Sequence, residues 1–229
     1  MNQLERGIHR AVLFDLDGTL VDTAPDMVAV LQSMQRDHNR APLTYELGRS
    51  YVSNGSVGLV AIGFPDSGDE MREQLRLEYL ERYALKVCER STVFAGLDVL
   101  LRQLDEGGIP WGVVTNKPQR FTNPLLAALK LDDRLACCVS GDTLTLRKPN
   151  PAPLLHACEL AGIDASESMY VGDSIRDIEA GQAAGMATIA AAYGYVTPED
   201  SAAAWGADSI ASDTQELAKI VLKAVNLGA

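Results

Sequence analysis

The sequence lacks the features of a secreted or membrane-spanning protein. Its four cysteines have the spacing of neither a zinc site nor a disulfide framework, so we expect reduced thiols and a cytoplasmic protein. No apolar run approaches the roughly 18 residues that a membrane-spanning helix needs. The N-terminal stretch MNQLERGIHR has no apolar signal core. The cysteines are Cys88, Cys137, Cys138 and Cys158.

Positive charge is also scarce. The 229 residues include 20 Lys and Arg against 31 Asp and Glu, which gives a net charge of −11. A chain with this charge repels nucleic acid and anionic membranes, so we expect neither as a partner. It also repels a small anionic substrate, unless a local cation offsets the field. The hydrophobic share of 47% is ordinary for a globular protein.

Strand-like runs alternate with helical patterns along most of the chain. This alternation predicts the α/β class, with a Rossmann-like, doubly wound parallel sheet covered by helices on both faces. The expected strands are 11–14, 111–115, 135–139, 168–171, 187–191 and 209–211, and the expected helices are 95–107, 123–130, 151–161, 174–184 and 215–225.

Residues 24–90 interrupt the alternation. Apolar spacing there predicts helices over 25–38, 43–62 and 69–88, with few strand signals between them. We interpret this stretch as an all-helical subdomain inserted after the first strand, which leaves 1–23 and 91–229 as the core domain. Sites in open α/β sheets lie beyond the carboxyl ends of the strands. The insertion leaves the sheet at that end, so we expect it to form a cap over the site.

Polar residues follow four of the expected strands. A single aspartate at a strand end commonly only turns the chain, but four complementary groups on one sheet edge are hard to explain in that way. Clustered carboxylates are hard oxygen donors that suit Mg²⁺, and a lysine is a point cation that suits phosphate. The set therefore indicates phosphoryl transfer. The residues are Asp15, Asp17, Thr115, Asn116, Lys148, Asp173 and Asp177.

The order of these motifs resembles the haloacid dehalogenase superfamily. DxDGT, a strand-end Thr-Asn, a Lys-Pro and GDxxxD follow one another over residues 11–192, and the insertion is similar to that superfamily's helical cap. RKPNPAPLL, AAYGYVTPED and WGAD are similar to the phosphoglycolate phosphatase branch. The resemblance implies a Mg²⁺-dependent phosphomonoester hydrolase that forms an aspartyl-phosphate on a small phosphorylated metabolite.

The resemblance also implies catalytic roles. Asp15 would be the nucleophile, and Asp17 would protonate the departing alkoxide and later accept a proton from water. Thr115 and Lys148 would bind and stabilise the transferring phosphoryl group, with Asn116 beside them.

The implied metal site uses the same strand ends. Mg²⁺ would be held by Asp15, the backbone carbonyl of Asp17, and Asp173. Asp177 lies four residues after Asp173, on the same face of a new helix. It could orient a metal-bound water or pair with Lys148; the alternative is a solvated pair with a basic residue such as Arg176.

The cap is the surface available to read the rest of the substrate. Ser53, Asn54 and Gly55 form a small polar cluster within YVSNGSVGLV, although an ordinary turn between helices would look similar. Related phosphoglycolate phosphatases often place an arginine shortly after this glycine, where this chain has Val57 and Gly58. The departure favours N-acetylmuramic acid 6-phosphate or a similar sugar phosphate over 2-phosphoglycolate. Arg49 could still supply a carboxylate contact.

Other functions share the fold. A sugar phosphomutase has the same core motifs and stays open, as does a catalytically silent binding protein. A phosphonate hydrolase needs a cap lysine, for which the insertion offers only Lys86. A dehalogenase needs neither a metal nor an acid at Asp17.

Overall fold

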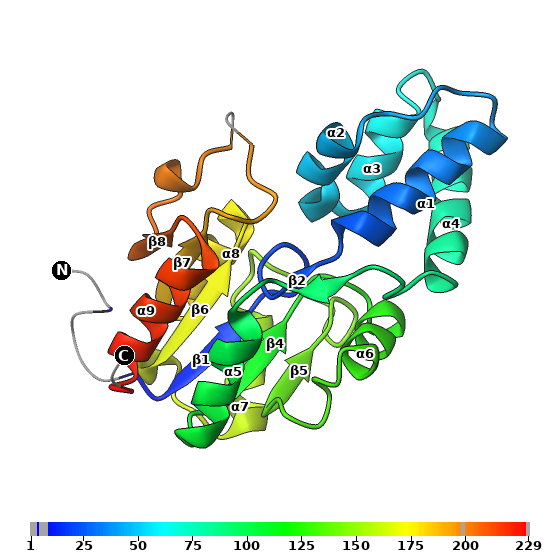
Figure 1. The fold of residues 1–229 in the computed structure, drawn as a ribbon. Helices are drawn as coiled ribbons and strands as arrows, with labels where there is room; N and C mark the ends of the chain where they lie inside the picture. The colour runs from blue at the N-terminus through cyan, green and yellow to red at the C-terminus, as the bar shows by residue number, and fades with distance from the viewer. Residues whose placement is uncertain (1–3, 5–8, 198–199, 228–229) are drawn as a thin grey trace.

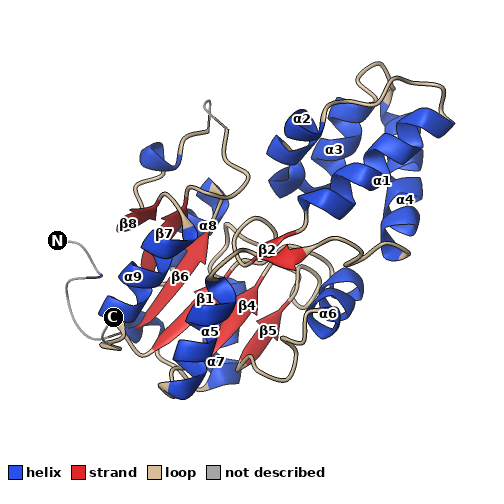
Figure 2. Cartoon of the chain, in the orientation of Figure 1, coloured by secondary structure: helices blue, strands red, loops and turns tan. Residues whose placement is uncertain are grey.

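Figures 1 and 2 show a parallel sheet with helices on both faces and a separate helical part above one end of it. The computed structural model describes residues 4, 9–197 and 200–227. The sheet has the order β5-β4-β1-β6-β7-β8, and every neighbouring pair is parallel. The predicted fold class is confirmed. The strands are β1 (Ala11–Phe14), β4 (Trp111–Val114), β5 (Cys137–Val139), β6 (Ser168–Gly172), β7 (Ala187–Ala191) and β8 (Ser209–Ala211).

The sheet is buried on both faces because its side chains alternate between two clusters. Val12 and Phe14 of β1 pack with α5 and α9, whereas Leu13 packs in a second cluster with α7 and α8. A strand buried on both sides needs continuous apolar residues, which is what β1 carries. The helices of this part are α5 (Leu97–Glu106), α6 (Gln119–Ala128), α7 (Ala152–Ala161), α8 (Ile175–Ala183) and α9 (Thr214–Ala224), with the short 3₁₀ helices η3 (Ala165–Glu167) and η4 (Ala202–Ala204).

The central position of β1 brings the strand ends together. Phe14, its last residue, pairs with Val113 of β4 on one side and Val171 of β6 on the other. The Asp15 amide continues this ladder by donating to the Val171 carbonyl at 2.8 Å. The polar residues that follow β1, β4 and β6 therefore leave the sheet at one edge.

The inserted part has a core of its own. Leu31 and Met34 of α1, Leu59 of α3 and Tyr79 of α4 are buried in one cluster. A short antiparallel pair, β2 (Val21–Asp22) with β3 (Thr92–Val93), stands where the chain enters and leaves this part, as Figure 2 shows. The other elements are α1 (Ala24–Asp37), α2 (Tyr45–Ser50), the 3₁₀ helix η2 (Val52–Asn54), α3 (Gly55–Gly63) and α4 (Asp69–Ala84). This arrangement supports the division at 23/24 and 90/91, which we keep as a proposal.

Two predicted helices differ from the structure. The helix expected over 43–62 is broken into α2, η2 and α3, because Gly55 adopts a positive φ of 61° that ends one helical path and starts another. The helix expected to begin at Asn123 begins at Gln119, which leaves Pro124 inside α6 rather than in its first turn. The other elements agree within a few residues.

Some expectations fall outside the described residues, among them the domain ends at 1 and 229 and two residues of AAYGYVTPED, Pro198 and Glu199. Among the described residues, no helix combines the length and the apolar character needed to cross a bilayer.

Candidate active site

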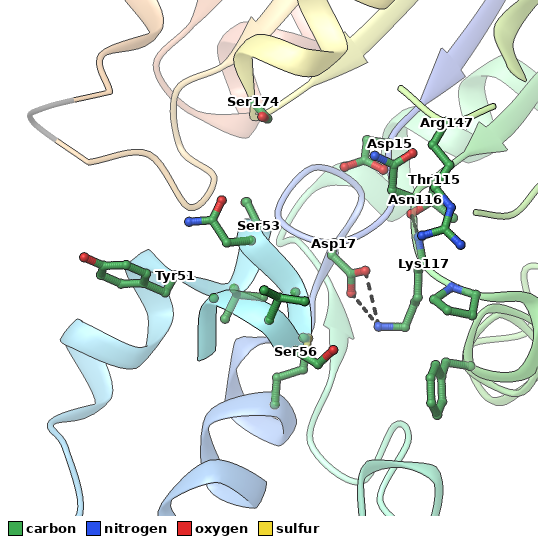
Figure 3. Close-up of a pocket in the computed structure, with 18 of the residues that line it drawn as sticks. Asp15, Asp17, Tyr51, Ser53, Ser56, Thr115, Asn116, Lys117, Arg147 and Ser174 are labelled. Atoms are coloured by element: carbon green, nitrogen blue, oxygen red, sulfur yellow. Dashed lines mark hydrogen bonds and ion pairs between the residues drawn. The ribbon is translucent and has the colours of Figure 1, made fainter. Parts of the chain in front are cut away.

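The strand ends and the cap enclose a cavity of about 710 Å³. Asp15, Asp17, Thr115, Lys148 and Asp173 line it from the sheet. The cap contributes the loop that contains η2, and Figure 3 shows Ser53 and Ser56 on the cap side of the pocket that Asp15 and Asp17 also line. The structure therefore brings the predicted strand-end residues and the predicted cap loop to one pocket.

Lys148 is the centre of a buried charge network. Its side chain is only 2% exposed, and its Nζ donates to Asp177 Oδ1 at 2.7 Å, to the Tyr170 hydroxyl at 2.7 Å and to the Val114 carbonyl at 3.0 Å. An ammonium has three protons, and these contacts use all three. Asp15 Oδ1 lies 2.9 Å from the same nitrogen as a charge partner without an aligned hydrogen bond. Burial lowers the pKa of Lys148, but Asp15 and Asp177 outweigh this and raise it, so the lysine stays charged.

Asp177 belongs to this network rather than to the surface. It is 2% exposed, and its Oδ2 accepts from the Ser174 amide at 3.1 Å in the capping box that starts α8. The structure therefore contradicts the solvated pair with Arg176, and shows instead the pairing with Lys148.

Three carboxylates form a cluster suited to a divalent cation. Asp15, Asp173 and Asp177 each offer an oxygen atom, and these atoms lie within 4.8 Å of one another. Burial, together with Asp177 and Asp17, raises the pKa of Asp15 to about 6 despite the opposing effect of Lys148. Burial, Asp15 and Asp177 raise the pKa of Asp173 to about 8. Such crowding costs free energy without a cation between the charges, and the buried Asp15 Oδ1 has no aligned donor. These residues fit a divalent metal.

Asp17 is held apart from this cluster. Both of its carboxylate oxygens accept from Lys117 Nζ, at 2.9 and 3.2 Å, and the Thr23 hydroxyl donates to Oδ1 at 2.5 Å. Lys117 is 8% exposed, and its Nζ lies 4.7 Å from the centroid of the Tyr83 ring in the cap. Burial lowers the pKa of Lys117, but the nearby Asp17 and Tyr83 raise it by more than burial lowers it. Lys117 therefore stays charged. Figure 3 shows the Asp17–Lys117 pair within the pocket.

Lys117 is a site residue that the sequence analysis missed. The motif VVTNK contains it, directly after the Thr115-Asn116 pair that was singled out. Thr115 and Asn116 carried the interpretation because their oxygen and amide groups suit a phosphoryl group. A buried lysine needs a carboxylate partner. In the first motif, the side chain of Asp17 had been given no cation, and this was the signal that could have led to Lys117.

Asn116 has a structural task in this conformation. Its side-chain amide donates to the Lys148 carbonyl at 3.0 Å, and its Oδ1 accepts from the Lys148 amide at 3.1 Å. Thr115 Oγ1 accepts from the Lys117 amide at 3.1 Å, which leaves its proton available to a ligand. Asn116 therefore joins the loop after β4 to the loop that carries Lys148, while Thr115 lines the pocket.

The cap contacts the cluster of three carboxylates through Ser53. Its hydroxyl donates to Asp173 Oδ2 at 2.9 Å, and its carbonyl accepts from Arg176 at 2.7 Å. Asn54 and Gly55 line the cavity beside it. Arg49 instead donates to the Tyr193 carbonyl at 3.2 Å and lies 4.9 Å from the Tyr195 ring centroid, and it is not among the residues that line the cavity.

Two glycines leave room for Asp173. A Cβ at Gly18 would lie 2.1 Å from Asp173 Oδ2, and one at Gly194 would lie 2.3 Å from Asp173 Cβ. Gly18 also has a φ of +85°, which other residues adopt at a cost. The Tyr195 amide then donates to Asp173 Oδ2 at 2.9 Å. The carboxylate is thus fixed by close backbone contact.

Comparison with known proteins agrees with this geometry. The family model described as haloacid dehalogenase-like hydrolase matches residues 12–191. The N-acetylmuramic acid 6-phosphate phosphatase of Pseudomonas aeruginosa is 43% identical over 217 residues, which are 94% of this chain and 96% of that protein. A phosphoglycolate phosphatase of Xylella fastidiosa is 40% identical over 210 residues, 92% of each chain.

A solved structure matches the fold as well. The crystal structure of a predicted phosphoglycolate phosphatase from Haemophilus somnus superposes with a TM-score of 0.81 and 27% identity, over 93% of this chain and 97% of that one. The chain belongs to the haloacid dehalogenase-like hydrolases. Its activity is that of a phosphatase, a phosphoric monoester hydrolase for a small phosphorylated metabolite.

Proposed function

We propose that this phosphatase is Mg²⁺-dependent and works through an aspartyl-phosphate on Asp15. The observation that carries the proposal is the buried cluster of Asp15, Lys148 and Asp177 at the end of β1. Asp15 would attack phosphorus, so that a bond from its carboxylate oxygen forms as the ester bond to the leaving oxygen breaks. Water would then hydrolyse the aspartyl-phosphate and release inorganic phosphate.

The neighbouring side chains have complementary roles in this scheme. Lys148 offsets the charge of Asp15 and of the phosphoryl oxygens, and the Thr115 hydroxyl donates to one of those oxygens. Asp17 gives its proton to the departing alkoxide and later takes one from the attacking water. Lys117 and Thr23 hold the Asp17 carboxylate in place.

The metal of this proposal is Mg²⁺. Asp15 and Asp173, with the backbone carbonyl of Asp17, would hold it, and Asp177 would stand behind them through its bond to Lys148. All of these donors are oxygen atoms, which favours Mg²⁺ over zinc. When bound, the metal supplies positive charge that stabilises the phosphoryl oxygens.

We propose N-acetylmuramic acid 6-phosphate, or a similar sugar phosphate, as the substrate. A cavity of about 710 Å³ has the size of sites for drug-sized ligands and exceeds what a two-carbon ester needs. Ser53 and Asn54 offer the hydroxyl and amide groups that a sugar can bind. The name of the Pseudomonas relative supports the choice. The Xylella relative makes 2-phosphoglycolate the second candidate. A cytoplasmic location, expected from the cysteines, belongs to the same proposal.

A phosphate-release assay tests the proposal. Purified protein is assayed with a panel of phosphate esters, in excess EDTA and again after Mg²⁺ is restored. We expect no turnover in EDTA, recovery with Mg²⁺, and poor recovery with Ca²⁺, whose looser coordination misplaces the reacting groups. Full turnover in EDTA would contradict the metal requirement. A kcat/KM that is tenfold higher for 2-phosphoglycolate than for the sugar phosphate would reverse the substrate order.

A further inference from the structure

The proposed substrates set an electrostatic problem for this chain. Both candidates carry a carboxylate besides the phosphate, whereas the protein has a net charge of −11. The cap loop YVSNGSVGLV contains no charged residue that could bind the carboxylate. A cation for this second group must therefore come from elsewhere in the cavity.

Four arginines line the cavity, and two of them are already engaged. Arg76 of the cap donates twice to Glu73, at 2.5 and 2.7 Å. Arg176 donates to the Ser53 carbonyl at 2.7 Å. Arg120 and Arg147 have neither a carboxylate within 4.0 Å nor a hydrogen-bond acceptor among the residues that the structure describes; Arg120 only lies 4.6 Å from the Phe121 ring centroid. These two guanidinium groups are available to a ligand.

Their backbone positions are fixed beside the phosphoryl site. Arg147 immediately precedes Lys148, whose main chain is tied to Asn116 by two hydrogen bonds. Arg120 stands in the first turn of α6, just after the loop that carries Lys117. Figure 3 shows Arg147 on the same side of the pocket as Thr115, Asn116 and Lys117. Both arginines thus belong to the sheet domain, Arg147 in the loop before Lys148 and Arg120 at the start of α6.

We propose that Arg147 and Arg120 form an anion subsite on the sheet side of the cavity, which binds the carboxylate of the substrate. This inference rests on the proposed function. A guanidinium presents paired donors that match the two oxygens of a carboxylate. The phosphoryl group does not need these arginines, because in the proposed function it is bound by Lys148, Thr115 and a metal. The sheet domain then binds both anionic groups of the substrate, and the uncharged cap loop contacts the part of the substrate that lies between them.

The test compares two pairs of esters that differ in a carboxylate. The first pair is N-acetylmuramic acid 6-phosphate and N-acetylglucosamine 6-phosphate, which lacks the lactyl acid. The second pair is 2-phosphoglycolate and 2-hydroxyethyl phosphate. We expect Arg147→Met with Arg120→Met to lower kcat/KM about tenfold or more for the carboxylate-bearing ester of the preferred pair, and less than threefold for its partner without the carboxylate. Arg36→Met, at an exposed arginine of α1 that does not line the cavity, should change neither value.

Binding in the Asp15→Asn background separates this inference from the proposed function. Calorimetry with the same ester pairs needs no turnover, so it reports on the subsite even if the wild-type enzyme hydrolyses none of them. Absent turnover would overturn the proposed function alone. Equal losses for the ester with the carboxylate and its partner without it, in affinity or in kcat/KM, would show that the arginines bind phosphate or act only on the fold, and would overturn the subsite.

Discussion

Asp173 and Asn54 face the same cavity, but the two regions that hold them are constructed differently. Asp173 is 2% exposed, lies against two glycines and accepts from Ser53 and the Tyr195 amide. Asn54 sits in a short 3₁₀ helix of the cap, and its side chain has no hydrogen bond to any residue that the structure describes. The sheet edge is a dense charge network, whereas the facing cap loop is uncharged and is tied to that edge through Ser53.

This contrast suggests a division of tasks in the proposed function: the sheet edge holds the reacting groups, and the cap loop recognises the rest of the substrate. In the proposed mechanism, groups that react with phosphorus must be placed within a fraction of an ångström, and Asp15 follows a strand whose backbone is paired on both sides. Groups that recognise a sugar can sit on an inserted subdomain, because their task changes from substrate to substrate. Substitutions at the sheet edge should therefore remove activity on every ester, and substitutions in the cap loop should change the relative activity on different esters.

The largest effect should come from Asp15, the proposed nucleophile. Asp15→Asn should lower kcat by about 10⁴-fold or more while the fold is kept, because Lys148 retains Asp177 as a charge partner. Phosphate release, thermal unfolding and mass spectrometry to exclude deamidation measure the outcome. Wild-type turnover in a variant free of deamidation would falsify the mechanism.

Lys148→Met should damage stability as well as activity. The substitution leaves the buried carboxylates of Asp15 and Asp177 facing each other without a cation, and breaking a buried pair in this way costs about 3–5 kcal/mol. Urea unfolding gives the free energy. Lys223→Met, at an exposed lysine of α9, is the control and should change it by less than about 0.5 kcal/mol. Similar values for the two variants would mean that the network is not a structural unit.

Lys117→Met tests whether the Asp17 carboxylate must be held in place. We expect kcat to fall about 10- to 100-fold for a sugar phosphate, whose alkoxide needs a proton as it leaves. It should fall only a few-fold for p-nitrophenyl phosphate, whose leaving group needs little help. The exposed cap lysine in Lys86→Met serves as the control. Equal losses on both esters would point to a role in substrate binding instead.

The stability of the metal-free protein should depend on pH through Asp173. The pKa of this carboxyl is raised from 3.8 to about 8 in the folded protein. Its contribution to stability is therefore full below pH 4 and is lost as the pH rises toward and through 8. In EDTA, wild type should lose about 1 kcal/mol or more relative to Asp173→Asn between pH 5 and pH 8. Parallel pH profiles of the two proteins, measured by urea unfolding, would rule out this titration.

The smallest effect should come from the cap loop. Asn54→Ala should change the ratio of kcat/KM between the sugar phosphate and 2-phosphoglycolate about threefold or more, since one hydrogen bond is worth about 1 kcal/mol. It should leave p-nitrophenyl phosphate nearly unaffected. A uniform loss across all three esters would place Asn54 with the sheet edge and remove the distinction between the two regions.

The sequence predicts site residues well where a polar side chain follows an apolar strand of the parallel sheet. Asp15, Thr115, Lys148 and Asp173 follow apolar strands of a parallel sheet, and any such sheet brings strand ends to one edge. Lys117 could not be assigned in this way, because its partner Asp17 lies 100 positions away and only the folded chain shows their contact. The break at Gly55 lies inside the polar cluster of Ser53, Asn54 and Gly55, for which a turn between helices was one of the two interpretations. In α6, Asn123-Pro124 imitates a helix start one turn inside the actual helix.

The glycines at 18 and 194 limit which residues can stand beside Asp173. A Cβ at either position would come within 2.3 Å of an Asp173 side-chain atom, so any larger residue there forces that side chain to shift. Val57 of the cap loop is 63% exposed and lines the same cavity, whereas a Cβ at Gly58 would lie 2.3 Å from the Asn54 Cβ. We therefore expect substitutions at Val57 and at the cavity arginines to alter substrate preference without displacing Asp173, and substitutions at either of the two glycines to displace it.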